Sequence, residues 1–557
     1  MEVPVKNPVS PLQAARAAYK PKLPKMLASK SVAVKKGRAT KSISNQAAIR
    51  DLFPNTYGQP EVSLSPGKGG IKTPKPIKVA LVLSGGQAPG GHNVVAGLHD
   101  GLKKLNRKNE LLGFLGGPSG LVEDKCIPIT DPLLEGYRNT GGFDIIGSGR
   151  TKLESEEQFQ KVRKNLKAHG VSALVVVGGD DSNTNAALLA EWFRKNNEPL
   201  CVVGCPKTID GDLKNNEIEV SFGFDTASKV YAELTGNILR DCLSAKKYWH
   251  FIKVMGRSAS HIALEVALKC RPNVCLISEE VAANQWTLAE VTEQIAKVVD
   301  SRAEKRKNYG VVVIPEGLVE FIPEIKALIH ELNDTLAGNA EFEKLESPTD
   351  KVAFVKSKLS AASKKAFDSL PADIQRQLLA DRDPHGNVQV SRIETEKLLM
   401  ETVDLKLKEW RKAGRYNGRF SALPHFFGYE GRCAAPSNFD ADYCYALGFT
   451  ASHLAAAGLT GYLASVRDLL KPAALWKCGG VPLTMMMNLE RRHGKDKPVI
   501  QKALVELAGK PFKSFAANRE TWALEDCYTS PGPIQYWGPS EVADLVPETL
   551  HLERGKK

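Results

Sequence analysis

Short apolar runs alternate with helical patterns between residues 79 and 314. Six runs have the length and composition of buried strands: Val79–Leu83, Leu174–Val177, Leu200–Gly204, Phe251–Met255, Val274–Ile277 and Val311–Ile314. Helical periodicity lies between several of them, at Asn93–Leu105, Glu156–Ala168, Thr184–Lys195, Thr226–Leu243, Ser258–Leu268 and Leu288–Arg306. Continuous apolar strands separated by helices are typical of a parallel sheet covered on both faces. The pattern therefore predicts an α/β fold.

The rest of the chain has a different pattern on each side of this core. Residues 1–75 are polar and dotted with prolines, which predicts a largely irregular arm before a core at 76–334. Residues 335–420 are helical in pattern without a strand run, at Asp350–Ala366, Ala372–Leu379 and Thr395–Ala413, which predicts a helical insertion. Residues 421–557 are expected to return to the α/β core, with only weak signals near Leu463 and at Ala503–Leu507.

Composition narrows the class of protein. The 557 residues are 42% hydrophobic and 25% charged, which is ordinary for a globular chain and excludes a disordered or fibrous one. No run approaches the ~18 apolar residues of a membrane span, and the first residues lack the apolar centre of a secretory signal. The ten cysteines form no CxxC pair, so neither a disulfide framework nor structural zinc is expected. These features favour a cytoplasmic protein without membrane contact.

The net charge of +13 is concentrated at one end. Residues 1–50 contain eleven Lys or Arg and one acid, Glu2, and account for +10. The body is therefore nearly neutral, and the basic arm is interpreted as a solvated extension, a contact for a subunit or polyanion, or a targeting peptide. Tyr19 is its single aromatic residue, so nucleic-acid binding is an unlikely primary function.

Ligands of parallel sheets bind at the carboxyl ends of the strands, so the loops after the apolar runs are the candidate sites. The first loop, Ser84–Asn93, has four glycines and leads into a helix, which suits it to an anion. It matches neither GxxxxGK[ST] nor GxGxxG, and a plain tight turn is the alternative.

Carboxylates dominate the next two loops. Asp180 and Asp181 follow a double glycine, where Mg²⁺ would relieve their repulsion, although a helix cap is the alternative. In the third loop, Lys207 could bind phosphate, while Asp210 and Asp212 could face a hydroxyl, a water or a metal. A solvated Asp-Gly-Asp turn is the alternative there.

Three more loops offer an arginine for a phosphate or sugar, a carboxylate for sugar hydroxyls, and an aromatic hydroxyl with an arginine, although plain solvated loops are the alternative for each. They carry Arg257 after Met255 and Gly256, Glu316 between Pro315 and Gly317, and Tyr429 with Arg432 among glycines. The full set supplies anion donors, paired carboxylates and cations, which is the equipment of phosphoryl transfer.

Six motifs carry a resemblance to a known family: SGGQAPGGHN (84–93), GGDDSN (178–183), PKTIDGD (206–212), MGR (255–257), PEG (315–317) and GYEGR (428–432). Their order and spacing resemble the phosphofructokinase family, most closely its diphosphate-dependent branch in the long form with catalytic β-type subunits. The resemblance runs from about Val79 to beyond Arg432. It implies two doubly wound, mostly parallel, Rossmann-like domains with a helical insertion.

Two positions separate this branch from the ATP-dependent one, whose motifs typically read GGDGS and PGTIDND. Here Asp181 and Lys207 replace the two glycines. An aspartate would fill the space that the α-phosphate of ATP needs and would repel that phosphate by its charge. A lysine would add positive charge at the transferred phosphoryl group.

The resemblance implies a role for each matched residue. Gly86 and Lys207 would bind diphosphate, Asp180 would bind Mg²⁺, Asp181 would exclude ATP, and Asp210 would be the general base. The sugar-phosphate site would comprise Thr208, Ile209, Asp210, Met255, Gly256, Arg257, Glu316, Tyr429 and Arg432. Lys247 and Tyr248 would reach it from a neighbouring subunit, which implies an oligomer.

The expected activity is reversible, Mg-dependent transfer of a phosphoryl group from diphosphate to the C1 hydroxyl of fructose 6-phosphate, giving fructose 1,6-bisphosphate and phosphate in glycolysis or gluconeogenesis. The alternatives are an ATP-dependent phosphofructokinase and a regulatory, non-catalytic subunit. The sequence leaves open whether the oligomer is a homo-oligomer or a hetero-oligomer with an α-type regulatory subunit. It also leaves open any response to fructose 2,6-bisphosphate.

Overall fold

The structure, a computed structural model, describes residues 11–67, 69–336, 339–380, 388–492, 495–534 and 544–555. The chain divides into two compact units. The first comprises Met1–Ala227, Tyr429–Ala503 and Ile534–Lys557, and the second comprises Ser228–Gly428 and Leu504–Pro533. No helix in the described ranges is both long and apolar enough to cross a membrane.

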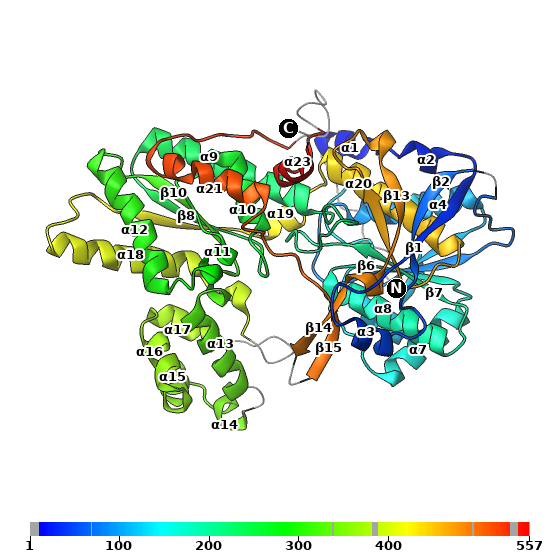
Figure 1. Ribbon diagram of the computed structural model, residues 1–557, viewed down its shortest axis with the longest axis horizontal. Helices are drawn as coiled ribbons and strands as arrows, with labels where there is room; N and C mark the ends of the chain where they lie inside the picture. The colour runs from blue at the N-terminus through cyan, green and yellow to red at the C-terminus, as the bar shows by residue number, and fades with distance from the viewer. Residues whose placement is uncertain are drawn as a thin grey trace. The chain divides into compact units, whose positions relative to one another are not determined.

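A nine-stranded sheet forms the centre of the first unit (Figure 1). Its order is β1 (Val32–Ala39), β2 (Pro60–Pro66), β13 (Lys477–Pro482), β12 (Tyr462–Arg467), β7 (Cys201–Pro206), β6 (Ala173–Gly178), β3 (Lys78–Leu83), β4 (Glu110–Phe114) and β5 (Cys126–Pro128). The strands from β12 to β4 run parallel, whereas the outer strands pair antiparallel. The predicted parallel sheet is therefore the centre of a mixed one.

Helices cover both faces of this sheet. On one face, Val82 and Val202 share a core with α7 (Glu156–Ala168) and α8 (Asp180–Lys195). Because side chains alternate along a strand, Cys201, the residue before Val202, points to the other face of the sheet. There its thiol contacts Ala455 O of α20 (Asn438–Ala456) at 3.7 Å. There α20 packs closely on α4 (Gly91–Leu105), because a Cβ at Gly97 would collide with the backbone of Tyr445. The doubly wound prediction is confirmed for this unit. Its other helices are α1 (Pro11–Ala17), α2 (Lys25–Ala28), α3 (Gln46–Leu52), α5 (Pro118–Glu123), α6 (Asp131–Glu135), α19 (Tyr429–Arg432) and α23 (Glu548–Arg554).

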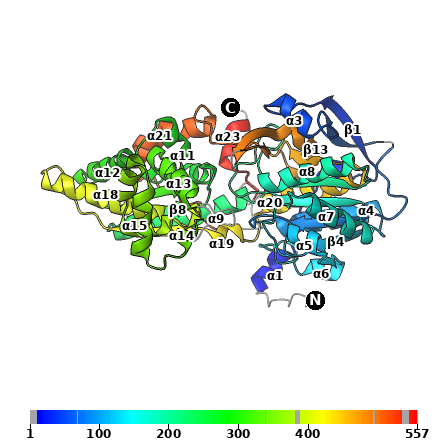
Figure 2. The same ribbon diagram turned by 90° about the horizontal axis from the view of Figure 1, so that it is seen from below.

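The second unit has a four-stranded, wholly parallel sheet in the order β11 (Ala422–Phe427), β8 (Trp249–Val254), β10 (Gly310–Pro315) and β9 (Val274–Cys275). One face packs on α12 (Leu288–Glu304), α13 (Pro323–Leu336) and α18 (Thr395–Lys412), and α12 and α18 lie side by side (Figure 2). The other face carries α10 (His261–Cys270), where the Cys275 thiol contacts Ala263 O at 3.5 Å. The unit also contains α9 (Phe224–Ala245) from Ser228 onward, α11 (Ser278–Ala283), α14 (Ala340–Glu343), α15 (Pro348–Lys358), α16 (Ala361–Asp368), α17 (Ala372–Leu378) and α21 (Lys510–Leu524).

The predicted insertion shares its core with this sheet. Phe367 and Leu399 are buried in one cluster with Val312 and Ile314 of β10. The single helix predicted at Asp350–Ala366 is two helices, because Ser360 caps α16 by accepting a bond from the Ser363 amide. The strand predicted to reach Ile277 ends at Cys275, and no helix or strand forms at Ala503–Leu507.

The predicted irregular arm differs most from the structure. Over residues 11–67 it contains three helices and the strands β1 and β2, while residues 1–10 lie outside the described ranges. Only Val62 and Leu64 of β2 point into the core, so the alternation is too short to stand out among serines and prolines. Tyr19 Oη and Lys22 N donate to the buried Asp442 carboxylate of α20 at 2.9 and 2.7 Å. This segment is part of the first unit.

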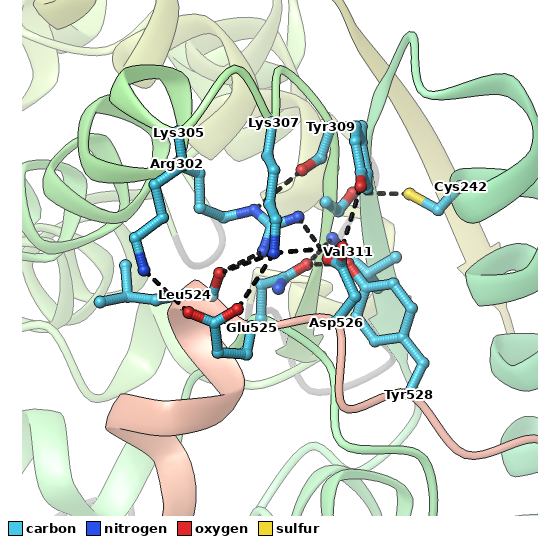
Figure 3. A network of polar contacts seen from close by, with 12 residues as sticks. Cys242, Arg302, Lys305, Lys307, Tyr309, Val311, Leu524, Glu525, Asp526 and Tyr528 are labelled. Atoms are coloured by element: carbon cyan, nitrogen blue, oxygen red, sulfur yellow. Dashed lines mark hydrogen bonds and ion pairs between the residues drawn. The ribbon is translucent and has the colours of Figure 1, made fainter.

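A polar network fastens the end of α21 to the rest of the second unit (Figure 3). Arg302, which is fully buried, donates to Tyr309 O and to Asp526 Oδ1 at 3.0 and 2.8 Å, and Tyr309 Oη donates to Asp526 Oδ2 at 2.9 Å. Lys305 and Lys307 pair with the half-exposed Glu525 at 2.8 and 3.2 Å. The buried cation therefore depends on one carboxylate supplied by a distant part of the chain.

Asp526→Ala is expected to lower the free energy of unfolding by about 3–5 kcal/mol, because it leaves the buried Arg302 guanidinium without its carboxylate. Glu525→Gln, the control, removes exposed pairs and is expected to cost under about 1 kcal/mol. Urea unfolding of both variants measures the difference. Equal losses would contradict the assignment of the buried pair as the stabilising contact.

Candidate active site

The glycine-rich loop between β3 and α4 is shaped by its backbone. Gly85 and Gly90 adopt φ of +83° and +95°, which favour glycine. Gly85 N donates to Gly149 O at 2.8 Å, so a loop that includes Gly149 lies against the glycine-rich loop. A Cβ at Gly86 would lie 2.6 Å from Arg432 Nη2, so the Arg432 guanidinium packs directly on this glycine. A cation from α19 therefore lies directly against the glycine-rich loop.

The two adjacent aspartates form the first turn of α8. The helix predicted from Thr184 begins at Asp180, and its N-cap is Gly179, so neither aspartate occupies the capping position proposed as the alternative. Negative charge in a first turn is favourable for a helix. Asp180 Oδ2 lies 3.5 Å from Lys502 Nζ, and the more exposed Asp181 has Oδ1 4.0 Å from Lys152 Nζ.

Lys207 lies at the end of β7, where its amide donates to Gly178 O at 2.9 Å. Its side chain is buried, and Nζ is 3.2 Å from the position of a Cβ on Gly85. Burial, followed by the charge of Arg432, lowers the pKa of Lys207 to about 8, against the attraction of Asp210 and Asp180. Lys207 is therefore a cation held beside the glycine-rich loop.

Asp210 and Asp212 occupy a fixed turn. Asp210 N donates to Thr208 Oγ1 at 3.0 Å, Gly211 has φ +76°, and Ile209 is buried. Asp212 is also buried, which corrects the alternative of a fully solvated turn. Burial raises the pKa of Asp212 to about 7, and the charges of Asp210 and Asp180 add to this while Lys502 opposes it. Asp212 therefore lies close enough to Asp210 and Asp180 to be repelled by both.

Three cations of this region were missed by sequence reasoning. Arg150 is close enough to lower the pKa of Lys207, Lys152 lies near Asp181, and Lys502 lies near Asp180. The first two occur in Gly147–Lys152, a short stretch of glycines and basic residues. This composition could have marked an anion-binding loop, although no apolar run precedes it. Lys502 has no local motif.

The second unit brings together another predicted set. Gly256, with φ +119°, follows β8, and its amide donates to Glu316 Oε2 at 3.2 Å. Glu316 follows the neighbouring parallel strand β10 and, like Met255, is buried, whereas Arg257 is exposed. These residues share the carboxyl edge of the sheet, as predicted.

Lys247 and Tyr248 are not brought to this edge in their own chain. They precede β8, whereas Arg257 follows it, and six strand residues place the two ends about 20 Å apart. Both are at least partly accessible. Tyr429 and Arg432 belong to α19 of the first unit, where the Arg432 guanidinium carbon lies 5.5 Å from the centre of the exposed Tyr429 ring.

Comparison with protein families matches residues 78–357, about half of the chain, to the family described as Phosphofructokinase. The chain belongs to the phosphofructokinase family. Its α/β architecture agrees with a solved family member, the pyrophosphate-dependent phosphofructokinase from Marinobacter aquaeolei. That similarity has a TM-score of 0.53 at 18% identity and covers 81% of this chain and 93% of the other.

Similar curated members of the phosphofructokinase family have nearly the same length. A protein of Porphyromonas gingivalis named pyrophosphate–fructose 6-phosphate 1-phosphotransferase is 55% identical, over 98% of this chain and 100% of that protein. One of the same name from Treponema pallidum is 55% identical, over 98% and 97%.

Plant relatives are named as two kinds of subunit. Subunit beta 1 of Arabidopsis thaliana is 50% identical, over 93% of this chain and 90% of that protein. Subunit alpha 2 of the same plant is 41% identical, over 97% and 88%. The resemblance to the diphosphate-dependent branch, and to its β-type, is confirmed by these identities.

Proposed function

We propose that this protein transfers a phosphoryl group from diphosphate to the C1 hydroxyl of fructose 6-phosphate, reversibly, forming fructose 1,6-bisphosphate and phosphate. The observation that carries the proposal is the pair Asp181 and Lys207, placed at the start of α8 and beside Gly85 in one unit. The names of the closely similar relatives support it.

The donor end of the reaction uses the cations around the glycine-rich loop. Lys207 and Arg432 lie against Gly85 and Gly86, whose backbone can approach a phosphate closely. Positive charge held in place favours the charge that develops on a transferring phosphoryl group. Asp181, directly after Asp180, is the side chain that excludes the larger nucleotide donor.

Mg²⁺ is the metal that suits this donor set. Among the described residues, no group of three His, Cys, Asp or Glu side chains could hold a metal ion by itself. Mg²⁺ commonly binds one or two carboxylates and completes its shell with water and substrate phosphates. Asp180, a partly accessible carboxylate that shares the Lys502 ammonium with Asp212, fits this requirement. When bound, Mg²⁺ would neutralise charge on the diphosphate.

The acceptor end uses Asp210 as general base. The Thr208 hydroxyl fixes the backbone of Asp210, so its carboxylate can be held toward the C1 hydroxyl and take its proton. Thr208, Ile209, Met255, Gly256, Arg257, Glu316, Tyr429 and Arg432 are proposed to bind the sugar phosphate, and Arg257 is suited to bidentate phosphate contacts.

The two alternatives are less well supported. An ATP-dependent enzyme is disfavoured by Asp181 and Lys207. A regulatory subunit is disfavoured because Asp180, Lys207, Asp210 and Arg257 are all present, and because identity to the plant beta subunit exceeds identity to the alpha subunit.

The test is an assay of the purified chain alone with fructose 6-phosphate, Mg²⁺ and diphosphate, followed by the reverse reaction from fructose 1,6-bisphosphate and phosphate. We expect turnover in both directions. Activity only after addition of a second, different subunit would favour the regulatory alternative and contradict the proposal.

We also propose that each sugar-phosphate site is completed by a neighbouring subunit. Lys247 and Tyr248 lie at the far end of β8 from Arg257, so they are available to another copy. The edge strand β11 also exposes apolar side chains, Leu423 and Phe426, each 39% accessible. Exposed apolar edge strands favour pairing with a partner.

This proposal predicts complementation between two inactive variants. Lys247→Ala is expected to raise KM for fructose 6-phosphate, so it is nearly inactive when assayed far below that raised KM, and Asp210→Asn is expected to lower kcat by about 10²–10⁴-fold. Co-refolding both should restore up to about a quarter of wild-type activity, because half of the random dimers have one intact shared site of two. Refolding each variant alone is the control, and no recovery in the mixture would contradict a shared site.

A further inference from the structure

Lys502 lies two residues after a two-stranded hairpin of the first unit, which packs on α8. The hairpin comprises β14 (Met487–Arg492) and β15 (Lys495–Ile500). Ile500 N donates to Thr184 Oγ1 of α8 at 3.2 Å, and Ala503 N donates to Asp212 O at 2.7 Å. Lys502 is therefore held between two of the predicted site loops by the backbone on either side of it.

The Lys502 ammonium faces two carboxylates of those loops. Nζ lies 3.5 Å from Asp180 Oδ2 and 4.0 Å from Asp212 Oδ2. Asp180 is the proposed Mg²⁺ ligand, and Asp212 is two residues after the proposed base. The Lys502 side chain is 28% accessible, so it is partly buried but remains within reach of solvent and ligand.

A cation at this position offsets negative charge in the proposed donor site. Two carboxylates, of Asp180 and Asp212, lie within 4.0 Å of the Lys502 ammonium, at the place where a strongly anionic diphosphate would bind. Lys207 offsets their charge from the side of the glycine-rich loop, and Lys502 does so from the hairpin side. A neutral side chain at 502 would leave Asp180 without this ion pair and would make the donor site more repulsive to an anion.

We propose that Lys502 is a positioning residue of the donor site, which holds Asp180 in place and supplies positive charge for Mg-diphosphate. This inference rests on the proposed function and extends it to a residue outside the six motifs. Lys502 acts on donor binding and has no part in the proton transfer at the sugar. Its loss is therefore expected to change KM for diphosphate but not KM for fructose 6-phosphate.

The test compares Lys502→Met with Lys502→Arg and with Lys497→Met, a matched control on the same hairpin whose ammonium faces Glu154 at 3.4 Å. Lys502→Met is expected to raise KM for Mg-diphosphate about 10- to 100-fold, as for loss of a charge-assisted contact. KM for fructose 6-phosphate and the melting temperature should be unchanged, Lys502→Arg should retain most of the affinity, and Lys497→Met should match wild type.

Calorimetric titration with Mg²⁺ and methylenediphosphonate, a non-hydrolysable diphosphate analogue, gives a second readout without turnover. The same loss of affinity in Lys502→Met supports the inference. Unchanged analogue binding, or an equal rise in both KM values, overturns it while the proposed function stands. Lys502→Gln replaces Lys502→Met should the latter fail to fold. Wild-type protein that neither binds the analogue nor uses diphosphate overturns the proposed function, and the inference with it.

Discussion

Asp210→Asn is expected to lower kcat by about 10²–10⁴-fold in both directions, because the amide cannot take the proton of the C1 hydroxyl. The variant should fold normally, since the fixed feature of this turn is the bond from Asp210 N to Thr208 Oγ1, which the substitution leaves in place. Steady-state rates with diphosphate, and with phosphate in the reverse direction, measure the effect.

The control for Asp210→Asn is Asp51→Asn, which makes the same chemical change on the exposed surface of α3. It should retain wild-type rates. Binding of fructose 6-phosphate to Asp210→Asn, followed by calorimetry, separates a lost base from a lost site. A variant that keeps more than about a tenth of the wild-type kcat would show that Asp210 is not the base.

Lys207→Met is expected to reduce kcat/KM for diphosphate by at least about 100-fold, since it removes a buried cation aimed at the transferring phosphoryl group. The pH profile gives an independent measurement. The lowered pKa of about 8 means that Lys207 is mostly charged at pH 7 and loses its charge as the pH rises through 8. Because kcat/KM reports groups of the free enzyme, it should fall on the alkaline side of pH 8.

Lys207→Arg is the matched variant for this profile. Arginine stays protonated throughout the range, so the alkaline fall in kcat/KM should disappear even where the absolute rate is lower. If kcat/KM of Lys207→Arg fell with the same midpoint pH, the group that titrates would be a residue other than Lys207.

The strands that could be predicted from the sequence are those whose residues are buried on both faces of the sheet. Every residue of β6 and β7 is buried, and both strands stand out as continuous apolar runs. Strand β13 was missed because it contains Gly479 and Gly480, which give no apolar signal. These glycines serve close packing instead, since a Cβ at Gly479 would collide with Val62 of β2. A sequence pattern does not register contacts of this kind.

The residues of the candidate site also differ in whether the sequence pattern could point to them. Asp180, Lys207, Asp210 and Glu316 each follow an apolar strand, so the strand-end rule makes them candidates from the sequence. Lys502 could not be found in this way. It reaches Asp180 only because a hairpin from the far end of the chain packs on α8, and no spacing in the sequence encodes that contact.

Donor preference tests the central proposal, that Asp181 and Lys207 fit the site to a bare diphosphate. The measurement is kcat/KM for Mg-diphosphate and for Mg-ATP at saturating fructose 6-phosphate, on the wild-type protein and on Asp181→Gly. Wild type should prefer diphosphate by at least about 100-fold, and Asp181→Gly should narrow that preference by admitting ATP. Equal use of both donors by the wild type, or a preference for ATP, would contradict the proposal.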